Sequence, residues 1–250
     1  MLELKGASEV VTSDVQIPGE GVTIRGFLAH PADPKPKPGI VVIHEWWGLN
    51  DHIKDIAQRF AREGFVALAP DLYSRLPAPA GAQGGPGDNK VTKDPTEAAK
   101  LMEGLQSQIV LTDLNAVVTM YLKAQPFVDP LKIGVVGFCM GGTFALMLVS
   151  HNSDIKAAVP FYGQIPPTDN LKYLLAPILY IYGGQDGWIT KQDVERLQQG
   201  LKQFGRPGEV KIYDNCPHAF FNDTRADVYR SNEAKDAWQR TLAFLRQHLR

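Results

Sequence analysis

The segment 137–142, Gly-Phe-Cys-Met-Gly-Gly, constrains the fold most, because it joins one apolar run to a second apolar run of helical character. It matches the nucleophile elbow G-x-S-x-G with cysteine in the serine position. In such a strand-to-helix turn the nucleophile takes strained dihedrals, and Gly137 and Gly141 leave room for crossing backbone. Cys139 is then expected at a helix N-terminus, where free N–H groups and the helix dipole favour a thiolate. The alternative is a small buried cysteine in a Gly-rich turn.

Short apolar runs alternate with helical patterns along the rest of the chain, which is typical of a parallel sheet covered by helices on both faces. The runs lie at 40–43, 65–69, 133–138, 157–162 and 178–182. They are apolar throughout, as strands buried on both faces must be. The segments 10–17 and 22–29 alternate more and predict an antiparallel edge, and 209–213 predicts a last strand. The sequence therefore predicts a mostly parallel sheet of about seven to eight strands in one domain, residues 1–250.

Helical spacing of apolar residues predicts the helices between these strands. They are expected around 53–60, 114–121, 194–204 and 238–249, the first capped by Asn50 or Asp51 and stopped by Gly64. A Gly/Pro-rich stretch at 77–87 lies inside a longer loop at about 74–94 and follows a predicted strand. Two interpretations of this loop stay open: a lid over a site at the carboxyl edge of the sheet, or a solvated connector.

Composition excludes several classes of partner. A net charge of −1 over 250 residues gives no electrostatic reason to expect nucleic acid or an anionic membrane. Two cysteines cannot build a disulfide framework or a structural zinc site, and His44-Glu45 is not part of an H-E-x-x-H helix. The first residues have no apolar signal-peptide core. We expect a cytoplasmic protein without metal or cofactor, as a monomer or small homo-oligomer.

A nucleophile at the elbow needs a base, and the base needs an orienting acid. In this topology the acid follows a later strand, and the histidine precedes the last helix. The segment 183–187, which contains Asp186, directly follows the run 178–182, and His218 lies between the last predicted strand and the closing helix. Both would leave the sheet edge that bears Cys139. Each residue alone could be an incidental loop group, but their order favours a triad.

The loop after the run 40–43 reads His-Glu-Trp-Trp-Gly. In this architecture that loop donates the second oxyanion-hole N–H, beside the N–H of the residue after the nucleophile. We assign these donors to Trp46 and Met140. Glu45 would then face the thiol at the edge of the site, unless it is a solvated loop carboxylate.

Five segments together resemble one family, the dienelactone hydrolases (carboxymethylenebutenolidase-like). They are 44–50, 69–73, 137–142, 184–186 and 217–220, and the likeness runs from about Val22 to the C-terminus. The resemblance implies an α/β-hydrolase fold and hydrolysis of an ester or lactone by a Cys139–His218–Asp186 triad. It also implies that Glu45 takes the thiol proton when substrate arrives.

The chain departs from that family where the substrate carboxylate is held. Typical members have an arginine four residues after the histidine, and here that position is Asn222. For their second arginine the chain offers Arg75, Lys90 and Lys93 without a clear match, while Arg225 is a substitute further along. The candidate substrate-binding residues are Trp47, Tyr73, Arg75, Trp188, Asn222 and Arg225.

The chemistry of cysteine narrows the substrates. A thiolate leaves a tetrahedral intermediate more readily than an alkoxide or amide, so activated esters and lactones with stabilised leaving groups are favoured over peptides. Two alternatives stay open. One is a redox-sensing or ligand-binding protein that uses Cys139, with Cys216 as a neighbour, and has no turnover. The other is acyl transfer or amide hydrolysis by the same triad.

Overall fold

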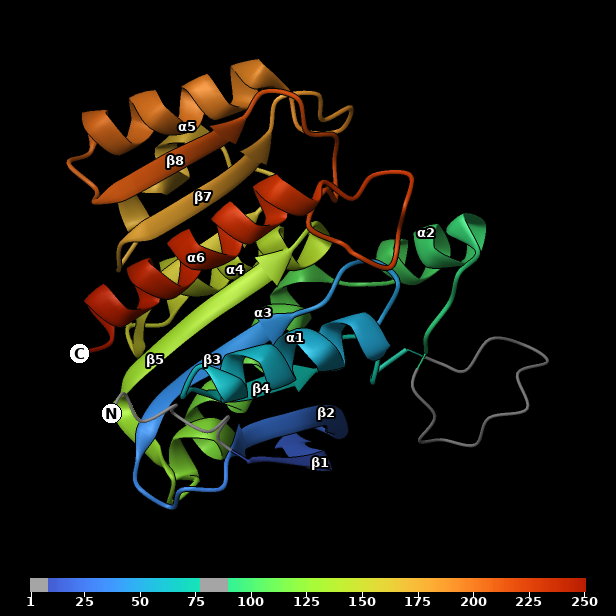
Figure 1. Cartoon of the computed structure of the whole chain (residues 1–250), viewed down its shortest axis with the longest axis vertical. Coiled ribbons are helices and arrows are strands. Elements are labelled where there is room, and N and C mark those ends of the chain that lie inside the picture. Colours follow the sequence, from blue (N-terminus) through green and yellow to red (C-terminus); the bar gives the residue numbers. More distant parts are fainter. Residues whose placement is uncertain (1–8, 77–89) are drawn as a thin grey trace, which may run out of the picture.

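The computed structural model describes residues 9–76 and 90–250, and it contains a single eight-stranded sheet (Figure 1). The strands are β1 (Val10–Gly19), β2 (Val22–Pro31), β3 (Lys37–Ile43), β4 (Val66–Pro70), β5 (Val128–Phe138), β6 (Ile155–Phe161), β7 (Ile178–Gly183) and β8 (Gly208–Tyr213). Their order across the sheet is β1-β2-β4-β3-β5-β6-β7-β8. β2 pairs antiparallel with β1 and with β4, and the remaining pairs are parallel. The predicted α/β-hydrolase architecture with an antiparallel edge is confirmed.

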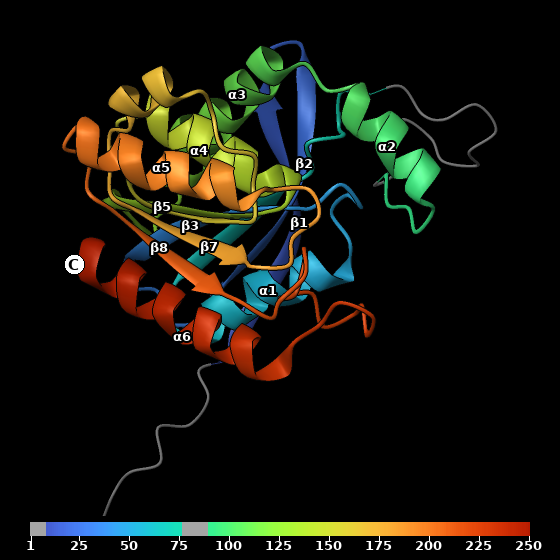
Figure 2. The ribbon, with the colours of Figure 1, turned by 90° about the horizontal axis from the view of Figure 1, so that it is seen from above.

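Helices cover both faces of the sheet (Figure 2). The α-helices are α1 (Asp51–Arg62), α2 (Pro95–Glu103), α3 (Ser107–Ala116), α4 (Met140–His151), α5 (Lys191–Gln203) and α6 (Ser231–His248). α1 and α6 lie on one face, and α3, α4 and α5 lie on the other. A π-helical stretch, η1 (Val117–Tyr121), and two short 3₁₀ helices, η2 (Leu122–Ala124) and η3 (Thr168–Tyr173), complete the helical elements in the described ranges.

Local signals explain where α1 begins and ends and where α2 begins. Asn50 caps α1 by accepting a hydrogen bond from the Ile53 N–H at 3.2 Å, and Gly64 follows the helix at a φ of +91°. The helix predicted over 114–121 begins earlier, because α3 starts at Ser107. From Val117 to Tyr121 the helix continues as the π-helical stretch η1. α2 was not predicted, although Asp94 as N-cap and Pro95 in the first turn are a standard start signal.

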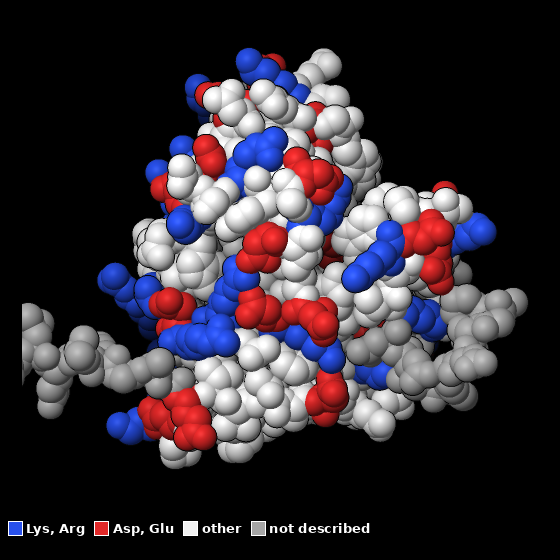
Figure 3. All heavy atoms as spheres, turned by 45° about the vertical axis from the view of Figure 1, so that its right-hand side comes forward, with Lys and Arg blue, Asp and Glu red and all other residues white. Residues whose placement is uncertain are grey.

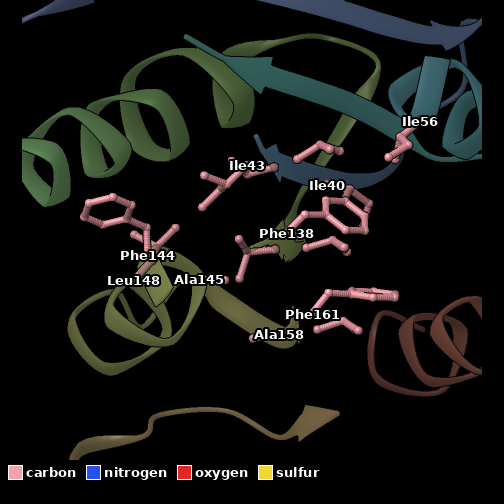
Figure 4. Close-up of a cluster of buried hydrophobic side chains, with 14 of the residues drawn as sticks. Ile40, Ile43, Ile56, Phe138, Phe144, Ala145, Leu148, Ala158 and Phe161 are labelled. Carbon is pink, nitrogen blue, oxygen red and sulfur yellow. The ribbon is translucent and has the colours of Figure 1, made fainter. Parts of the chain in front are cut away.

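The apolar runs form the core between the helices and the sheet (Figure 4). The rings of Phe138 on β5 and Phe161 on β6 pack with centroids 4.7 Å apart, and Phe221 stacks on Phe138 at 5.3 Å. Phe221 belongs to the loop between β8 and α6, so the core reaches the end of the sheet where His218 lies. Packing of this kind fixes that loop against the carboxyl ends of β5 and β6.

The surface charge and the helix lengths bear on the partners expected from the sequence. Acidic and basic side chains are interspersed on the face of Figure 3, without a large area of one sign. Among the described residues, no helix has the length and apolar character needed to cross a membrane. The Gly/Pro-rich stretch at 77–87 lies outside the described residues, so the prediction of a lid at about 74–94 stays a prediction.

Candidate active site

Cys139 occupies a strained turn between β5 and α4. Its φ is +55° and its ψ is −119°, a backbone conformation that L-residues rarely adopt. A Cβ on Gly137 would lie 2.0 Å from the Gly141 carbonyl oxygen, and a Cβ on Gly141 would lie 2.3 Å from the Ile43 carbonyl oxygen. Only glycine fits at both positions, because the backbones of β5, α4 and β3 cross so closely. The turn therefore has the strained, close-packed geometry that is typical of a nucleophile elbow.

His218 and Asp186 form a direct pair at the same edge of the sheet. Nδ1 of His218 lies 2.7 Å from Oδ2 of Asp186. The other carboxylate oxygen of Asp186 accepts the backbone N–H groups of Trp188 at 2.7 Å and Ile189 at 2.9 Å. These bonds hold the carboxylate in one orientation, with one oxygen free to fix the imidazole tautomer. Trp188 also packs edge-on against the ring of His218, at 5.4 Å between centroids.

The Cys139 thiol is buried and lies close to two backbone N–H groups. The nearby backbone N–H groups of Met140 and Trp46 lower its pKa, as donors close to a thiolate do. Burial has the larger, opposite effect and, with the nearby Glu45 carboxylate, raises the pKa of Cys139 far above its ordinary value. The resting group is therefore a neutral thiol. The two N–H groups beside it are those assigned from the sequence.

Glu45 is buried beside the thiol and has one unsatisfied oxygen. Its Oε2 accepts a hydrogen bond of 2.6 Å from the side-chain amide of Asn222, whereas Oε1 has no partner among the described residues. Burial raises the pKa of Glu45, and the nearby His52 ring and the Asn222 bond oppose that rise. Asn222 thus contacts Glu45, and this bond, rather than a substrate carboxylate, occupies its amide.

The site opens into one cavity of about 240 Å³. Its lining consists mainly of aromatic and sulfur-containing side chains: Glu45, Trp46, Trp47, Met102, Cys139, Trp188, His218, Ala219 and Arg225. The guanidinium of Arg225 lies over the ring of Trp47, 5.9 Å from its centroid, and pairs with Asp227 at 2.6 Å. Within the described residues, Arg225 is the cationic side chain that lines this cavity.

Other predicted substrate-binding residues lie elsewhere. Arg75 is not brought to the cavity, because its guanidinium forms a bidentate pair with Asp113, both bonds at 2.7 Å. Tyr73 is fully buried, and its hydroxyl donates to the Trp46 carbonyl at 2.8 Å. Lys90 donates to the backbone carbonyls of Tyr73 and Leu76.

A second cavity adjoins the first and shares Trp47 and Arg225 with it. It measures about 300 Å³ and has a polar lining: Trp47, Asn50, Thr92, Lys93, Asn222, Thr224 and Arg225. Of the lysines considered from the sequence, Lys93 is the one at this second cavity.

Several residues of the site were missed from the sequence. Met102 comes from the unpredicted helix α2, for which the Asp94-Pro95 signal was available. His44 is fully buried behind Glu45, and its place directly before Glu45 was its only signal. The described residues contain no group of three or more His, Cys, Asp or Glu side chains arranged to hold a metal ion.

The comparisons with known proteins agree on one family. The family model of the dienelactone hydrolase family matches residues 24–249. A protein of Aquifex pyrophilus named "Protein usf" is 36% identical over 245 residues, covering 94% of this chain and 98% of that protein. A protein of Escherichia coli strain K12 named "Putative carboxymethylenebutenolidase" is 33% identical over 250 residues, covering 96% of this chain and 88% of the relative.

A solved structure supports the same assignment. The crystal structure of "Putative Dienelactone Hydrolase from Klebsiella pneumoniae" superposes with a TM-score of 0.84 at 32% identity, covering 96% of this chain and 99% of that chain. The match of the family model spans the strained elbow, the His218–Asp186 pair and the Glu45 loop. The chain is therefore a hydrolase that belongs to the dienelactone hydrolase family.

Proposed function

We propose that this hydrolase cleaves carboxylic ester or lactone bonds with Cys139 as nucleophile, His218 as base and Asp186 as orienting acid. One observation carries the proposal: a strained cysteine elbow opens into the same cavity as a His–Asp pair and a buried carboxylate. A turn of this strain persists only where the surrounding structure enforces it, and such turns cluster at functional sites.

The reaction would begin with the transfer of the thiol proton. The neutral Cys139 is protected from oxidation at rest, and the free Oε1 of Glu45 is a fitting acceptor once substrate fills the cavity. The thiolate then adds to the carbonyl carbon and forms a C–S bond. The oxygen of the tetrahedral intermediate would be held by the N–H groups of Trp46 and Met140. Collapse breaks the C–O bond, the leaving alkoxide or enolate takes the proton held by Glu45, and a thioester remains on Cys139.

Hydrolysis of the thioester would use the second pair of groups. His218 takes a proton from water, and the hydroxide adds to the thioester carbonyl in the same oxyanion hole. Collapse then breaks the C–S bond, and the thiolate regains a proton from the His218 imidazolium. Asp186 would hold the imidazole in the tautomer that accepts this proton at Nε2.

The cavity favours small substrates with an apolar acyl or leaving group. A volume of about 240 Å³ lined by three tryptophans and a methionine suits an aryl or enol ester or a lactone. A thiolate leaves the tetrahedral intermediate more readily than an ordinary alkoxide does. Esters and lactones whose leaving group is a stabilised enolate are therefore expected to react fastest. We further propose that the protein acts in the cytoplasm, as a monomer or small homo-oligomer, without membrane or nucleic-acid partners.

The test compares Cys139→Ala with Cys216→Ala, since both cysteines are buried and free. Turnover of p-nitrophenyl acetate should fall by about 10³-fold or more in Cys139→Ala and stay within about twofold of wild type in Cys216→Ala. Mass spectrometry of the quenched wild type should detect one acyl adduct, located on Cys139. Near-normal turnover by Cys139→Ala would refute the mechanism. A thiol that alkylates but never acylates would favour a redox or binding role.

A further inference from the structure

The segment that follows β4 holds the loop that carries Trp46 by two hydrogen bonds. The backbone N–H of Leu72 donates to Nε2 of His44 at 3.0 Å, and the hydroxyl of Tyr73 donates to the Trp46 carbonyl at 2.8 Å. The Tyr73 hydroxyl also lies 3.8 Å from the sulfur of Met140. His44 and Tyr73 are both fully buried, so neither is a surface group that touches the loop by chance.

The tautomer of His44 follows from its two contacts. A backbone N–H can only donate, so Nε2 of His44 must accept the bond from Leu72. In the neutral ring the proton then sits on Nδ1, which lies 2.5 Å from the Glu45 carbonyl oxygen and donates to it. Burial lowers the pKa of His44, which favours the neutral ring, although the neighbouring Asp71 acts in the opposite direction.

These bonds fix the two peptide groups on either side of the Trp46 Cα. The Glu45 carbonyl and the Trp46 N–H belong to one planar trans peptide and point in opposite directions. When His44 holds the carbonyl, the N–H points the other way, toward Cys139, whose pKa it lowers. Tyr73 holds the next carbonyl, so the loop cannot rotate at Trp46 without breaking a buried hydrogen bond.

We propose that His44 and Tyr73 are positioning residues that orient the Trp46 N–H toward the oxyanion of the tetrahedral intermediate. The proposal rests on the proposed function, in which Trp46 is one of two oxyanion donors. It also gives the Asp71–Tyr73 segment a role: it supplies the backbone donor to His44 and the hydroxyl of Tyr73. Donors held in place before the reaction need no reorganisation as charge develops, which is why their orientation affects rate more than binding.

The first test is Tyr73→Phe, which removes one oxygen atom from the buried ring. Because loss of a whole oxyanion donor costs about 10²–10³-fold in kcat, loosening one should lower kcat by about tenfold or more and leave KM within about twofold. The matched control is Tyr180→Phe, since the buried hydroxyl of Tyr180 also donates to a backbone carbonyl, that of Gly163. Equal losses in both variants would overturn the proposal, because they would reflect packing alone.

The second test uses His44→Gln and His44→Leu. A glutamine amide can donate and accept as His44 does, so it should restore part of the kcat that His44→Leu loses. Thermal melting of each variant reports whether the fold persists. No advantage of glutamine over leucine at equal melting temperature would contradict the positioning role.

A third measurement does not depend on turnover. Because the Trp46 N–H lowers the pKa of the Cys139 thiol, Tyr73→Phe should move the pH midpoint of iodoacetamide alkylation upward, whereas Tyr180→Phe should not. If the wild type hydrolyses no ester, the proposed function fails, yet this shift still tests the orientation of Trp46. If the wild type is active and the midpoint and kcat are unchanged in Tyr73→Phe, the inference fails alone.

Discussion

The side-chain amide of Asn222 donates a hydrogen bond of 2.6 Å to the Glu45 carboxylate and joins the loop after β3 to the loop that bears His218. The Asn222 side-chain oxygen accepts from the backbone N–H and hydroxyl of Thr224, at 3.1 and 2.7 Å, which fixes the amide. A neutral donor therefore holds the proposed proton acceptor in place and leaves its second oxygen free.

Asn222→Ala should shift the pH dependence of the reaction. Burial already raises the pKa of Glu45, and the Asn222 bond opposes that rise, so its loss should raise the pKa further. A hydrogen bond to a charged group contributes about 1.5–3 kcal/mol, or about one pH unit or more. Only the ionised Glu45 can accept a proton, so the acid limb of the kcat/KM profile should move to higher pH by that amount.

The control for this variant is Asn152→Ala. Asn152 is also a buried amide, and it donates to Asn115 at 2.8 Å, at the end of α4 opposite Cys139. Its loss should leave the acid limb in place. An acid limb that is equally unmoved in Asn222→Ala, with only a lower plateau, would mean that Asn222 positions Glu45 without affecting its charge.

Glu45→Gln should have two separate effects. Activity should fall because the proton acceptor is gone. The thiol should also alkylate faster with iodoacetamide near pH 7, because the Glu45 charge is one of the causes that raise the pKa of Cys139. Burial is the larger cause and remains in the variant, so the gain in alkylation rate should be modest. Unchanged alkylation would show that burial alone keeps the thiol neutral, and unchanged kcat would remove Glu45 from the mechanism.

The same substitution should stabilise the fold in a pH-dependent way. The pKa of Glu45 is raised in the folded state, so ionising it costs more there than in the unfolded chain. That cost is absent below the unfolded pKa and reaches its full size once the pH exceeds the folded pKa. Glu45→Gln should therefore raise the melting temperature at pH 8 more than at pH 4. A gain of equal size at both pH values would contradict a buried charge.

Asp186→Asn tests the orientation of His218. The 2.7 Å contact fixes the Nδ1–H tautomer, and an amide in its place favours the wrong one, so kcat should drop by about 10²–10⁴-fold with little loss of stability. Circular dichroism and thermal melting check the fold beside the kinetics. Restoration of activity by added zinc would point to a metal role for Asp186 instead.

The fold and the chain order of the reactive groups were predictable, whereas most side-chain partners were not. The apolar runs and the elbow are local signals, and the order Cys139, Asp186, His218 follows from the topology. Arg75 was a candidate for substrate binding, but its partner Asp113 lies on α3, and no local pattern announces that pairing. The resemblance implied a Cys139 thiol that keeps its proton at rest beside Glu45. Burial, the larger cause of its raised pKa, had no local signal in the sequence.

Anion recognition should depend on Arg225 and not on Arg75. Arg225 lines both adjoining cavities, and its pair with Asp227 is solvent-exposed, whereas Arg75 is fully engaged by Asp113. An arginine–carboxylate contact contributes about 1.5–3 kcal/mol when desolvated, and less here because Arg225 is partly exposed. Arg225→Gln should therefore lower kcat/KM for an anionic lactone by about tenfold and leave an uncharged ester of similar leaving group within about twofold. Arg75→Gln, the matched control, should leave kcat/KM for both substrates unchanged.

In the wild type, the preference for the anionic lactone over the uncharged ester should stay below about a hundredfold, near 2.7 kcal/mol, because Asn222 stands where typical family members have an arginine that holds the substrate carboxylate. A larger preference, or one that survives Arg225→Gln, would require a second cation at the site.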